Sequence, residues 1–550
     1  MRSNVLKSSI EKATFTIICQ VLFRCISFIL NAYIIRTVGQ DVLGIMNVRL
    51  LLLESTILFL SQEPIFKACL ADTTSQNWAQ IVNQVWISVP LCICISSVLV
   101  YIWINFLSTV DPVYLSQYKI GCYAMAVSCI IEQVTQVMVL ASQSYCFVKL
   151  KVMLDTVYVI SRTIIFVYFV HNNPSFALNA FSIAQVASSI ILLLLYVGFF
   201  VWYISALNEF KKKELSKHAM FSDMTDFPFT SVKDFLPGVM ANHQDSLLDK
   251  KTCLLTVSFL KQSAVKQILT EGEKYVMTIS PVLTFSEQSM YDIVNNLGSL
   301  AARFIFRPIE ESSYFYFTQM IKRDVPLEDQ NQGKISESAE VVGQLGKIVT
   351  SIGLVIVVFG QSYSHAFLYL YGGKQLVEPD LPVLLMRYHS FAIVLLAVNG
   401  VTEGYVFATM DNQQIDRYNY LMVIFSIVFL LISYVFTCTI GPVGFILANC
   451  FNMSARIIHS IIFIRKRYKN TRHNPLIGFF PGKKFLSVLI LSGILAKISE
   501  MVIYEKSLLL HISIGAVLFA TVAFFWCLEN LKSLKLGYDK YKRRVSLKMD

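Results

Sequence analysis

Long apolar runs constrain the fold of this chain more than any other feature. The run from Ala13 to Ile35, ATFTIICQVLFRCISFILNAYII, is long enough to cross a membrane, which takes about 20 residues of helix. Similar runs recur throughout the 550 residues, of which 55% are hydrophobic and only 15% charged. A soluble domain carries roughly 25% charged residues. We therefore predict an all-α polytopic membrane protein whose first run spans the membrane and is not removed as a signal peptide.

The apolar runs divide into about fourteen predicted transmembrane helices. An even number places both termini on one side of the membrane. The loops on that side contain about 31 Lys and Arg residues, against about three in the opposite loops, so the positive-inside rule predicts cytosolic termini. The net charge of +11 then reflects topology and anionic lipid rather than nucleic-acid binding. The predicted spans are 13–35, 44–66, 80–107, 119–144, 149–170, 176–206, 257–284, 289–317, 341–370, 382–410, 418–438, 442–464, 485–504 and 508–528.

A long polar stretch beginning NEFKKKELSKH separates six predicted helices from eight. Paired lobes are typical of transporters, and a weak internal repeat favours them, because VGQDVLGIMNV and FSEQSMYDIVN each follow the first helix of a half. We predict two six-helix lobes, two C-terminal helices and a central hydrophilic cavity. The expected parts are an N-terminal lobe at 1–207, a cytosolic linker loop at 208–256, a C-terminal lobe at 257–465, and a cytosolic loop, the last two helices and a basic cytosolic tail at 466–550.

Charged residues are numerous inside the predicted spans. Ionisable groups at membrane depth almost always face a bundle interior or a watery cavity. Pairing between helices explains any single one of them equally well, but buried pairs seldom stabilise a protein more than apolar packing does. A hydrated cavity between two lobes explains the whole set better. The set comprises Arg24, Arg49, Glu54, Glu132, Asp155, Arg162, Lys261, Lys266, Glu271, Glu273, Lys274, Arg303, Glu310, Glu311, Glu403 and Arg456.

The stretch FLKQSAVKQILTEGEKYVMT, residues 259–278, opens the second half and carries several of these charges. On a continuous helix Lys266 and Lys274 share one face, Glu273 lies beside that face, and Glu271 lies on the other side. A helix with this load cannot be wholly exposed to lipid. We predict that it lines the cavity.

Four arginines point to the chemistry of the substrate. They come from different predicted spans, the first, second, eighth and twelfth. The guanidinium group suits bidentate capture of phosphate oxygens where the dielectric constant is low. An anionic substrate that carries phosphate is therefore expected. These arginines are Arg24, Arg49, Arg303 and Arg456.

Motifs of several other function classes are missing from the sequence. Without a G-x-x-x-x-G-K-[ST] loop, ATP is not expected to drive this chain directly. A sugar transferase would need acidic metal ligands, but no D-x-D motif is present and Glu328–Asp329 falls in a predicted cytosolic loop, so we predict no enzyme. The sequence shows no filter-like ring of a channel. The cysteines lack a C-x-x-C pair and the histidines are scattered, so neither a metal nor a cofactor is predicted.

Several stretches resemble the Rft family, the eukaryotic endoplasmic-reticulum branch of the multidrug/oligosaccharidyl-lipid/polysaccharide exporter superfamily. The resemblance implies fourteen helices in two lobes around a central cavity, working by alternating access. It also implies an association with moving dolichol-pyrophosphate-linked oligosaccharide to the lumenal leaflet for N-glycosylation. Between about residues 13 and 470 it rests on QVLFRCISFILNAYIIR, NVRLLLLESTILFL, FVKLKV, KQILTEGEKYVMT, YDIVNNLGSLAARFIFRPIEES, NGVTE, DRYN and VGFILANCFNM.

The resemblance also bears on the arginines. Related bacterial lipid II and polysaccharide flippases place arginines of the first, second and eighth helices against the pyrophosphate, and Arg24, Arg49 and Arg303 occupy matching helices here. Arg456 has no such guide and is predicted on physical grounds alone.

The leading hypothesis is a transporter of the endoplasmic-reticulum membrane that moves this glycolipid from the cytosolic to the lumenal leaflet without ATP. The four arginines are predicted to hold the pyrophosphate. The alternative is a non-transporting accessory or scaffold protein of the dolichol-linked oligosaccharide pathway, and membrane lipids and other proteins of that pathway are the expected partners. An ion-coupled exporter fits poorly, because Asp155 can pair with Arg162. Residues predicted to bind sugars or gate the cavity are Lys266, Glu271, Glu273, Lys274, Asn295, Asn296, Glu403 and Asn449.

Overall fold

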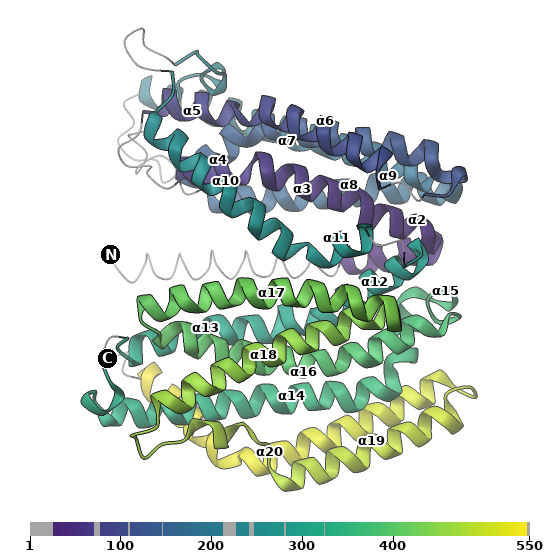
Figure 1. Ribbon diagram of the computed structural model, residues 1–550, viewed down its shortest axis with the longest axis vertical. Helices are drawn as coiled ribbons and strands as arrows, with labels where there is room; N and C mark the ends of the chain where they lie inside the picture. The colour runs from purple at the N-terminus through teal and green to yellow at the C-terminus, as the bar shows by residue number, and fades with distance from the viewer. Residues whose placement is uncertain are drawn as a thin grey trace. The chain divides into compact units, whose positions relative to one another are not determined.

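The computed structural model of the chain describes residues 26–70, 77–107, 110–145, 147–212, 227–240, 247–279, 282–323 and 325–546. Helices are the only regular secondary structure in these ranges (Figure 1). Eleven helical segments among them are long and apolar enough to cross a membrane. The all-α membrane fold is therefore confirmed, while the predicted number of fourteen spans is not. The chain divides into two compact units, one ending at Ser289 and the other beginning at Met290.

The first unit is built mainly on three long helices, α7, α8 and α9, which pack on one another, while α6 packs against α7 and α3. Its core gathers aromatic and aliphatic side chains such as Tyr196, Phe200 and Tyr203. Along the chain its described helices are Ile26–Thr37, α2 (Gln40–Gly44), η1 (Ile45–Leu50), α3 (Leu51–Ser61), α4 (Glu63–Leu70), α5 (Trp78–Trp86), α6 (Ser88–Asn105), α7 (Pro112–Ser144), α8 (Val148–Asn172), η2 (Pro174–Phe176), α9 (Ala177–Lys212), η3 (Val232–Phe235), α10 (Lys250–Thr270) and α11 (Gly272–Ile279).

The second unit is centred on α16, which packs against α14, α18 and α13. The helices α19 and α20 form a pair that packs on α14. In Figure 1 this unit runs from teal through green to yellow. Its helices are the end of α12 (Phe285–Ala301), η4 (Ala302–Phe306), α13 (Arg307–Met320), η5 (Leu327–Asp329), α14 (Gln332–Gly372), α15 (Lys374–Val377), α16 (Asp380–Thr409), α17 (Asn412–Ile440), α18 (Val443–Arg467), η6 (Pro475–Phe479), α19 (Lys483–Ile503) and α20 (Leu508–Ser546).

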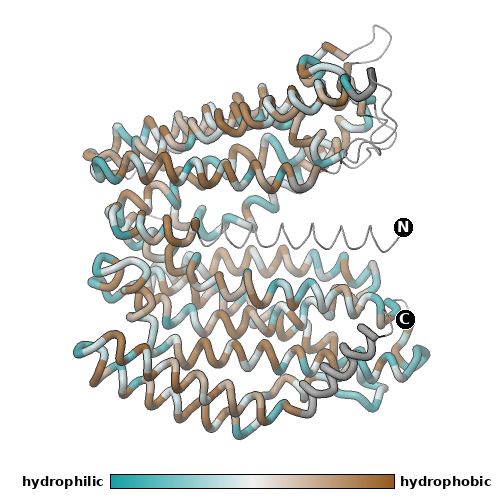
Figure 2. Tube along the Cα trace, turned by 180° about the vertical axis from the view of Figure 1, so that it is seen from behind, coloured by the Kyte–Doolittle hydropathy of each residue, from teal (hydrophilic) through white to brown (hydrophobic). Residues whose placement is uncertain are grey.

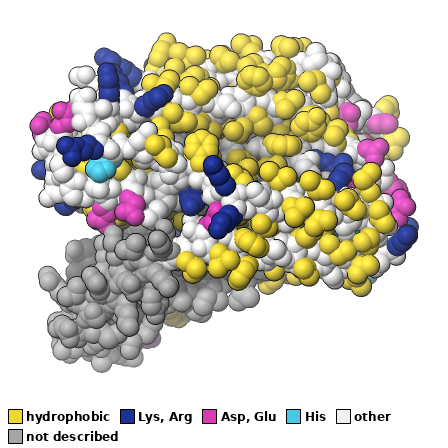
Figure 3. All heavy atoms as spheres, turned by 90° about the horizontal axis from the view of Figure 1, so that it is seen from below, with side chains coloured by type: hydrophobic (Ala, Val, Ile, Leu, Met, Phe, Trp, Pro, Cys, Tyr) yellow, Lys and Arg dark blue, Asp and Glu magenta, His cyan; other side chains and the backbone are white. Residues whose placement is uncertain are grey.

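The long helices expose large apolar side chains, as lipid contact requires. On α19 and α20, Leu491, Ile498, Val517 and Phe524 are all more than half exposed. Hydrophobic residues follow the long helices in Figure 2, and one face of the molecule in Figure 3 is largely covered by hydrophobic side chains, with charged ones mainly toward its two ends. Monomeric soluble proteins rarely expose such contiguous apolar surface. This surface suits contact with the hydrocarbon of a bilayer.

The helix predicted over 257–284 is interrupted. It starts earlier than expected, at Lys250, where Asp249 caps it by accepting hydrogen bonds from the backbone and hydroxyl of Thr252. These bonds stabilise the carboxylate and lower the pKa of Asp249. The helix then ends at Thr270, and a new helix begins at Gly272. The continuous face expected through Lys266 and Lys274 is thus broken at Glu271.

Part of the predicted linker loop is folded against the first unit. The segment 227–240 places Phe235 over Phe229, with ring centroids 4.3 Å apart, and near Phe200, at 4.9 Å. The indole of Trp86 donates a hydrogen bond to the carbonyl of Phe235 at 2.8 Å. The predicted lobe boundaries stay a prediction, but this segment is an ordered part of the first unit rather than a bare connection.

Candidate functional site

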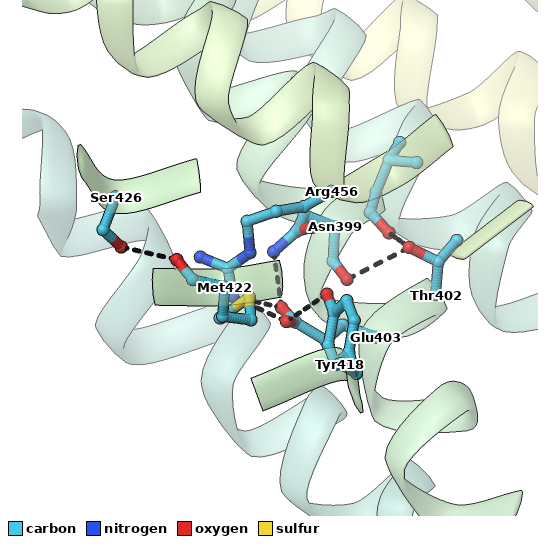
Figure 4. Close-up of polar contacts among 8 residues, drawn as sticks. Asn399, Thr402, Glu403, Tyr418, Met422, Ser426 and Arg456 are labelled. Atoms are coloured by element: carbon cyan, nitrogen blue, oxygen red, sulfur yellow. Dashed lines mark hydrogen bonds and ion pairs between the residues drawn. The ribbon is translucent and has the colours of Figure 1, made fainter. Parts of the chain in front are cut away.

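A buried polar cluster in the second unit is centred on Glu403 of α16, whose side chain is only 5% exposed (Figure 4). Arg456 of α18 donates from Nη2 to both carboxylate oxygens, at 2.7 and 2.5 Å. The hydroxyl of Tyr418 on α17 donates to Oε1 at 2.8 Å, and the amide of Asn399 donates to Oε2 at 2.8 Å. Three helices thus meet at one carboxylate, and both of its oxygens accept hydrogen bonds.

The ion pair in this cluster has an energetic consequence. A buried pair adds little net stability, but removing one partner costs about 3–5 kcal/mol because the other charge is stranded. The Nε of Arg456 is buried without a hydrogen-bond partner. To bind an anion through Nη2, Arg456 would have to release Glu403.

Arg303 lies in a different environment. Its side chain is exposed in the second unit, where Nη2 donates to the hydroxyl of Ser299 at 2.6 Å and to the amide oxygen of Asn296 at 3.3 Å. The amide of Asn296 in turn donates to Asp292 at 3.1 Å. Two predicted residues, Arg303 and Asn296, are thus brought together, and neutral groups orient the guanidinium group without neutralising it.

Arg49 is buried in the first unit, with 3% of its surface exposed. Its Nη1 donates to the carbonyls of Thr278 at 2.7 Å and Leu107 at 3.3 Å, and its guanidinium carbon lies 5.3 Å from the ring centroid of Phe285. Arg49 therefore ties separate segments of the first unit together.

The two arginines share an unusual backbone setting. The described residues contain two π-helical segments, η1 and η4, and these carry Arg49 and Arg303 respectively. π-Helical turns are rare and are frequent at functional sites. Each extra residue in the turn shifts the side chains that follow around the helix, and this shift is not visible in hydropathy.

The charged residues of the stretch 259–278 mostly have partners within the first unit. Lys266 Nζ lies 3.1 Å from Glu63 Oε1, which is also 2.6 Å from Lys67 Nζ. Lys274 Nζ lies 3.0 Å from Glu271 Oε2. Such partly exposed pairs contribute little to stability, because water screens them.

The remaining predicted site residues are placed more simply. Glu273 is half-buried in α11, and Asn295 and Asn449 are half-buried in the second unit. Arg24 lies outside the described residues. The roles predicted for all four stay predictions.

A second buried network links four helices of the first unit. Gln185 donates from Nε2 to Glu54 Oε1 at 2.7 Å and to the hydroxyl of Tyr158 at 3.0 Å. Tyr158 and Ser189 donate to Glu132 Oε1 at 2.8 and 3.2 Å. The two glutamates are thus held in interhelical hydrogen bonds, which is the packing role that the sequence left open.

Comparison with known proteins assigns the chain to a family. The family model described as Rft protein matches residues 8–540. The chain belongs to the Rft family. A relative from Drosophila melanogaster is 47% identical over 100% of both chains, and one from Xenopus tropicalis is 41% identical over 93% of both. A Saccharomyces cerevisiae relative is 26% identical over 88% of this chain and 87% of its own.

These Rft relatives share the name Man(5)GlcNAc(2)-PP-dolichol translocation protein RFT1. The name describes a translocation protein rather than an enzyme. Among solved structures, lipid II flippase MurJ in an inward closed conformation is similar, with a TM-score of 0.59 over 94% of this chain and 100% of the MurJ chain. At 10% identity this likeness shows the fold alone.

Sequence reasoning missed Tyr418, although the Rft motifs contained the signal. Asn399 and Glu403 are the ends of NGVTE, and Tyr418 is the third residue of DRYN. The hydrogen bonds show that these two motifs meet at one carboxylate. A tyrosine next to charged residues at the start of an apolar run was the available clue.

Proposed function

We propose that this protein moves a dolichol-pyrophosphate-linked oligosaccharide from the cytosolic to the lumenal leaflet of the endoplasmic-reticulum membrane for N-glycosylation. The observation that carries the proposal is its likeness over the full chain to relatives named for translocation of Man(5)GlcNAc(2)-PP-dolichol. The flippase-like fold supports a transport role, because the same architecture is used by a protein named for lipid II flipping.

The physical problem of this transport is the glycan. Each sugar hydroxyl brought into hydrocarbon without a hydrogen-bond partner costs several kcal/mol, roughly 4–8 on a cyclohexane scale. The headgroup must therefore cross in a polar cavity while the dolichol tail stays in lipid. Alternating access of the two lobes would carry the headgroup across. Net flow then follows consumption of the glycolipid on the lumenal side, without ATP.

Arginines would hold the pyrophosphate during this passage. Arg303 is the strongest candidate among the described residues, since its guanidinium group is exposed and is oriented by neutral partners. Arg49 and Arg456 would have to exchange partners, because carbonyl groups and Glu403 bind them now. Arg24 completes the proposed set.

The polar residues of the proposed cavity would bind sugars or gate the lobes. Carboxylates and amides accept or donate the hydrogen bonds that sugar hydroxyls lose on leaving water. The proposed set is Lys266, Glu271, Glu273, Lys274, Asn295, Asn296, Glu403 and Asn449.

Reconstitution tests the proposed function. Purified protein is placed in liposomes with a labelled glycolipid, and a membrane-impermeant probe reports the fraction in the outer leaflet. If the protein translocates the glycolipid, the accessible fraction should be higher in vesicles that contain the protein than in empty vesicles. Equal fractions at all times would contradict transport and would favour an accessory or scaffold role in the same pathway.

A further inference from the structure

A cavity of about 440 Å³ lies within the second unit, beside the cluster at Glu403. Its walls include Glu310, Glu311 and Tyr314 of α13, Arg323 just after that helix, and Phe407 of α16. Its volume falls in the range of about 300–1,000 Å³ that small-molecule sites occupy. The sequence placed Arg323 in a predicted cytosolic loop, so the cavity lies at the predicted cytosolic end of this unit.

Glu310 is the distinctive group in this cavity. Its side chain lies over two glycines of α16, and a Cβ at Gly400 would come within 3.1 Å of Glu310 Oε2. The part of the chain that the structure describes gives the Glu310 carboxylate no hydrogen bond or ion pair, although the residue is only half-exposed. Its oxygens are therefore available as acceptors for a ligand in the cavity.

The charged residues of the cavity balance one another, which suits a neutral ligand. Arg323 is its one cationic lining residue, and it donates to the carbonyls of Ala408 and Phe407 at the end of α16, at 3.2 and 3.4 Å. The lining has two carboxylates, of which Glu311 lies 3.0 Å from Arg307. With Glu311 paired, the charge of Glu310 is balanced by that of Arg323, so the cavity has no net charge to attract an anion.

A neutral sugar suits this lining. Its hydroxyl groups can donate to Glu310 and accept from Tyr314, because a hydroxyl both donates and accepts. The rings of Tyr314 and Phe407 offer apolar faces against which the C–H groups of a pyranose can pack. Acceptors, a hydroxyl and aromatic surface thus occur together in one cavity.

We propose that this cavity binds neutral sugar residues of the glycan headgroup, with Glu310 accepting hydrogen bonds and Tyr314 packing against a sugar ring. The identity of the ligand rests on the proposed function. The cavity is a glycan subsite at the predicted cytosolic end of the second unit.

Binding of the free glycan tests the subsite. The probe is radiolabelled Man5GlcNAc2 released from its lipid, so that it carries neither pyrophosphate nor dolichol, and binding to the purified full-length protein is measured by equilibrium dialysis. Glu310→Gln removes a charged acceptor at nearly constant volume and is expected to weaken binding about tenfold. Tyr314→Leu, at a 40% exposed position, should also weaken it. Glu328→Gln, an exposed change outside the cavity, should bind as the unchanged protein does.

The outcomes separate this inference from the proposed function. Unchanged binding in both cavity variants, with thermal midpoints equal to the parent's, would overturn the subsite. Displacement of the glycan by millimolar ethanolamine would also overturn it, since that marks a cation site. The leaflet assay runs in parallel on the unchanged protein. Glu310-dependent binding without translocation supports the subsite and refutes transport, whereas translocation with Glu310-independent binding refutes the subsite alone.

Discussion

Arg303 and Arg456 were both predicted to hold pyrophosphate, yet their side chains have different partners. Arg456 is bound to a buried carboxylate, whereas Arg303 is exposed and bound to a hydroxyl and an amide. Removing Arg456 strands a charge, but removing Arg303 strands none. A loss of function is therefore easier to interpret at Arg303 than at Arg456.

Arg303→Ala and Arg303→Lys should separate binding from stability. We expect the thermal stability to change by no more than about 0.5 kcal/mol, as at other exposed positions. Translocation should fall in both variants, because lysine keeps the charge but loses the bidentate fork. The measurements are thermal unfolding in detergent and the leaflet assay. Lys334→Ala, at another exposed cationic position of the second unit, is the control and should leave both unchanged, whereas full activity of Arg303→Ala would exclude Arg303 from the substrate site.

Arg456→Ala should destabilise the second unit by about 3–5 kcal/mol, because Glu403 loses its charged partner. Adding Glu403→Gln removes the stranded charge and should restore most of that stability. The measurement is the thermal midpoint of the single and double variants, with N-glycosylation in cells as the functional readout. Rescue of both properties by the double variant would mean that Arg456 serves packing, whereas rescue of stability alone would keep it as a substrate ligand.

The sequence predicted both members of this pair but not the pairing. Glu403 and Arg456 are 53 positions apart on helices that are separated by α17, and their meeting depends on how α16 and α18 are rotated. Hydropathy does not encode that rotation, since a polar residue inside an apolar run is the same signal whichever way it faces. Residue types at the site were predictable, but their contacts were not.

At the scale of elements, the long spans were predictable and their interruptions were not. Eleven predicted spans correspond to helices that are long and apolar enough to cross a membrane. The break at Glu271 and the π-helical turns at Arg49 and Arg303 each involve a few backbone hydrogen bonds. Composition averaged over about 20 residues, the length of a span, is insensitive to such local changes.

The linker segment 227–240 allows a test at the scale of elements. It is held against the first unit by aromatic packing that the sequence did not reveal. Phe235 is 2% exposed, so Phe235→Ala should cost about 3–5 kcal/mol and release the segment. Limited proteolysis of the purified protein should then cut this segment faster. Leu236→Ala, at a neighbouring position that is 47% exposed, is the control and should leave the cleavage rate unchanged. Equal cleavage of Phe235→Ala and the parent would mean that other contacts hold the segment.

At the scale of the whole molecule, charge asymmetry carries information that the helices alone lack. The structure shows the fold of each unit. The side of the membrane on which each loop is predicted to lie depends on the distribution of Lys and Arg between the spans. The proposed direction of transport depends on this topology, because the glycan must enter the cavity from the cytosolic side. The cavity lined by Glu310 lies at the cytosolic end of the unit only if the loop after α13 lies in the cytosol.

Single cysteines can test this topology in sealed endoplasmic-reticulum microsomes, once all 12 native cysteines are replaced. Cysteine at Lys334 or Arg472 should react with a membrane-impermeant maleimide added outside, because the surplus of positive charge places these exposed positions in the cytosol. Cysteine at Pro112 or Lys374, also exposed, should react only after the membrane is permeabilised. The permeabilised sample is the control for reactivity at each site. Labelling of Lys374→Cys in sealed vesicles would shift the span count by one, reverse the sides of the second unit, and remove the Glu310 cavity from the cytosolic entrance.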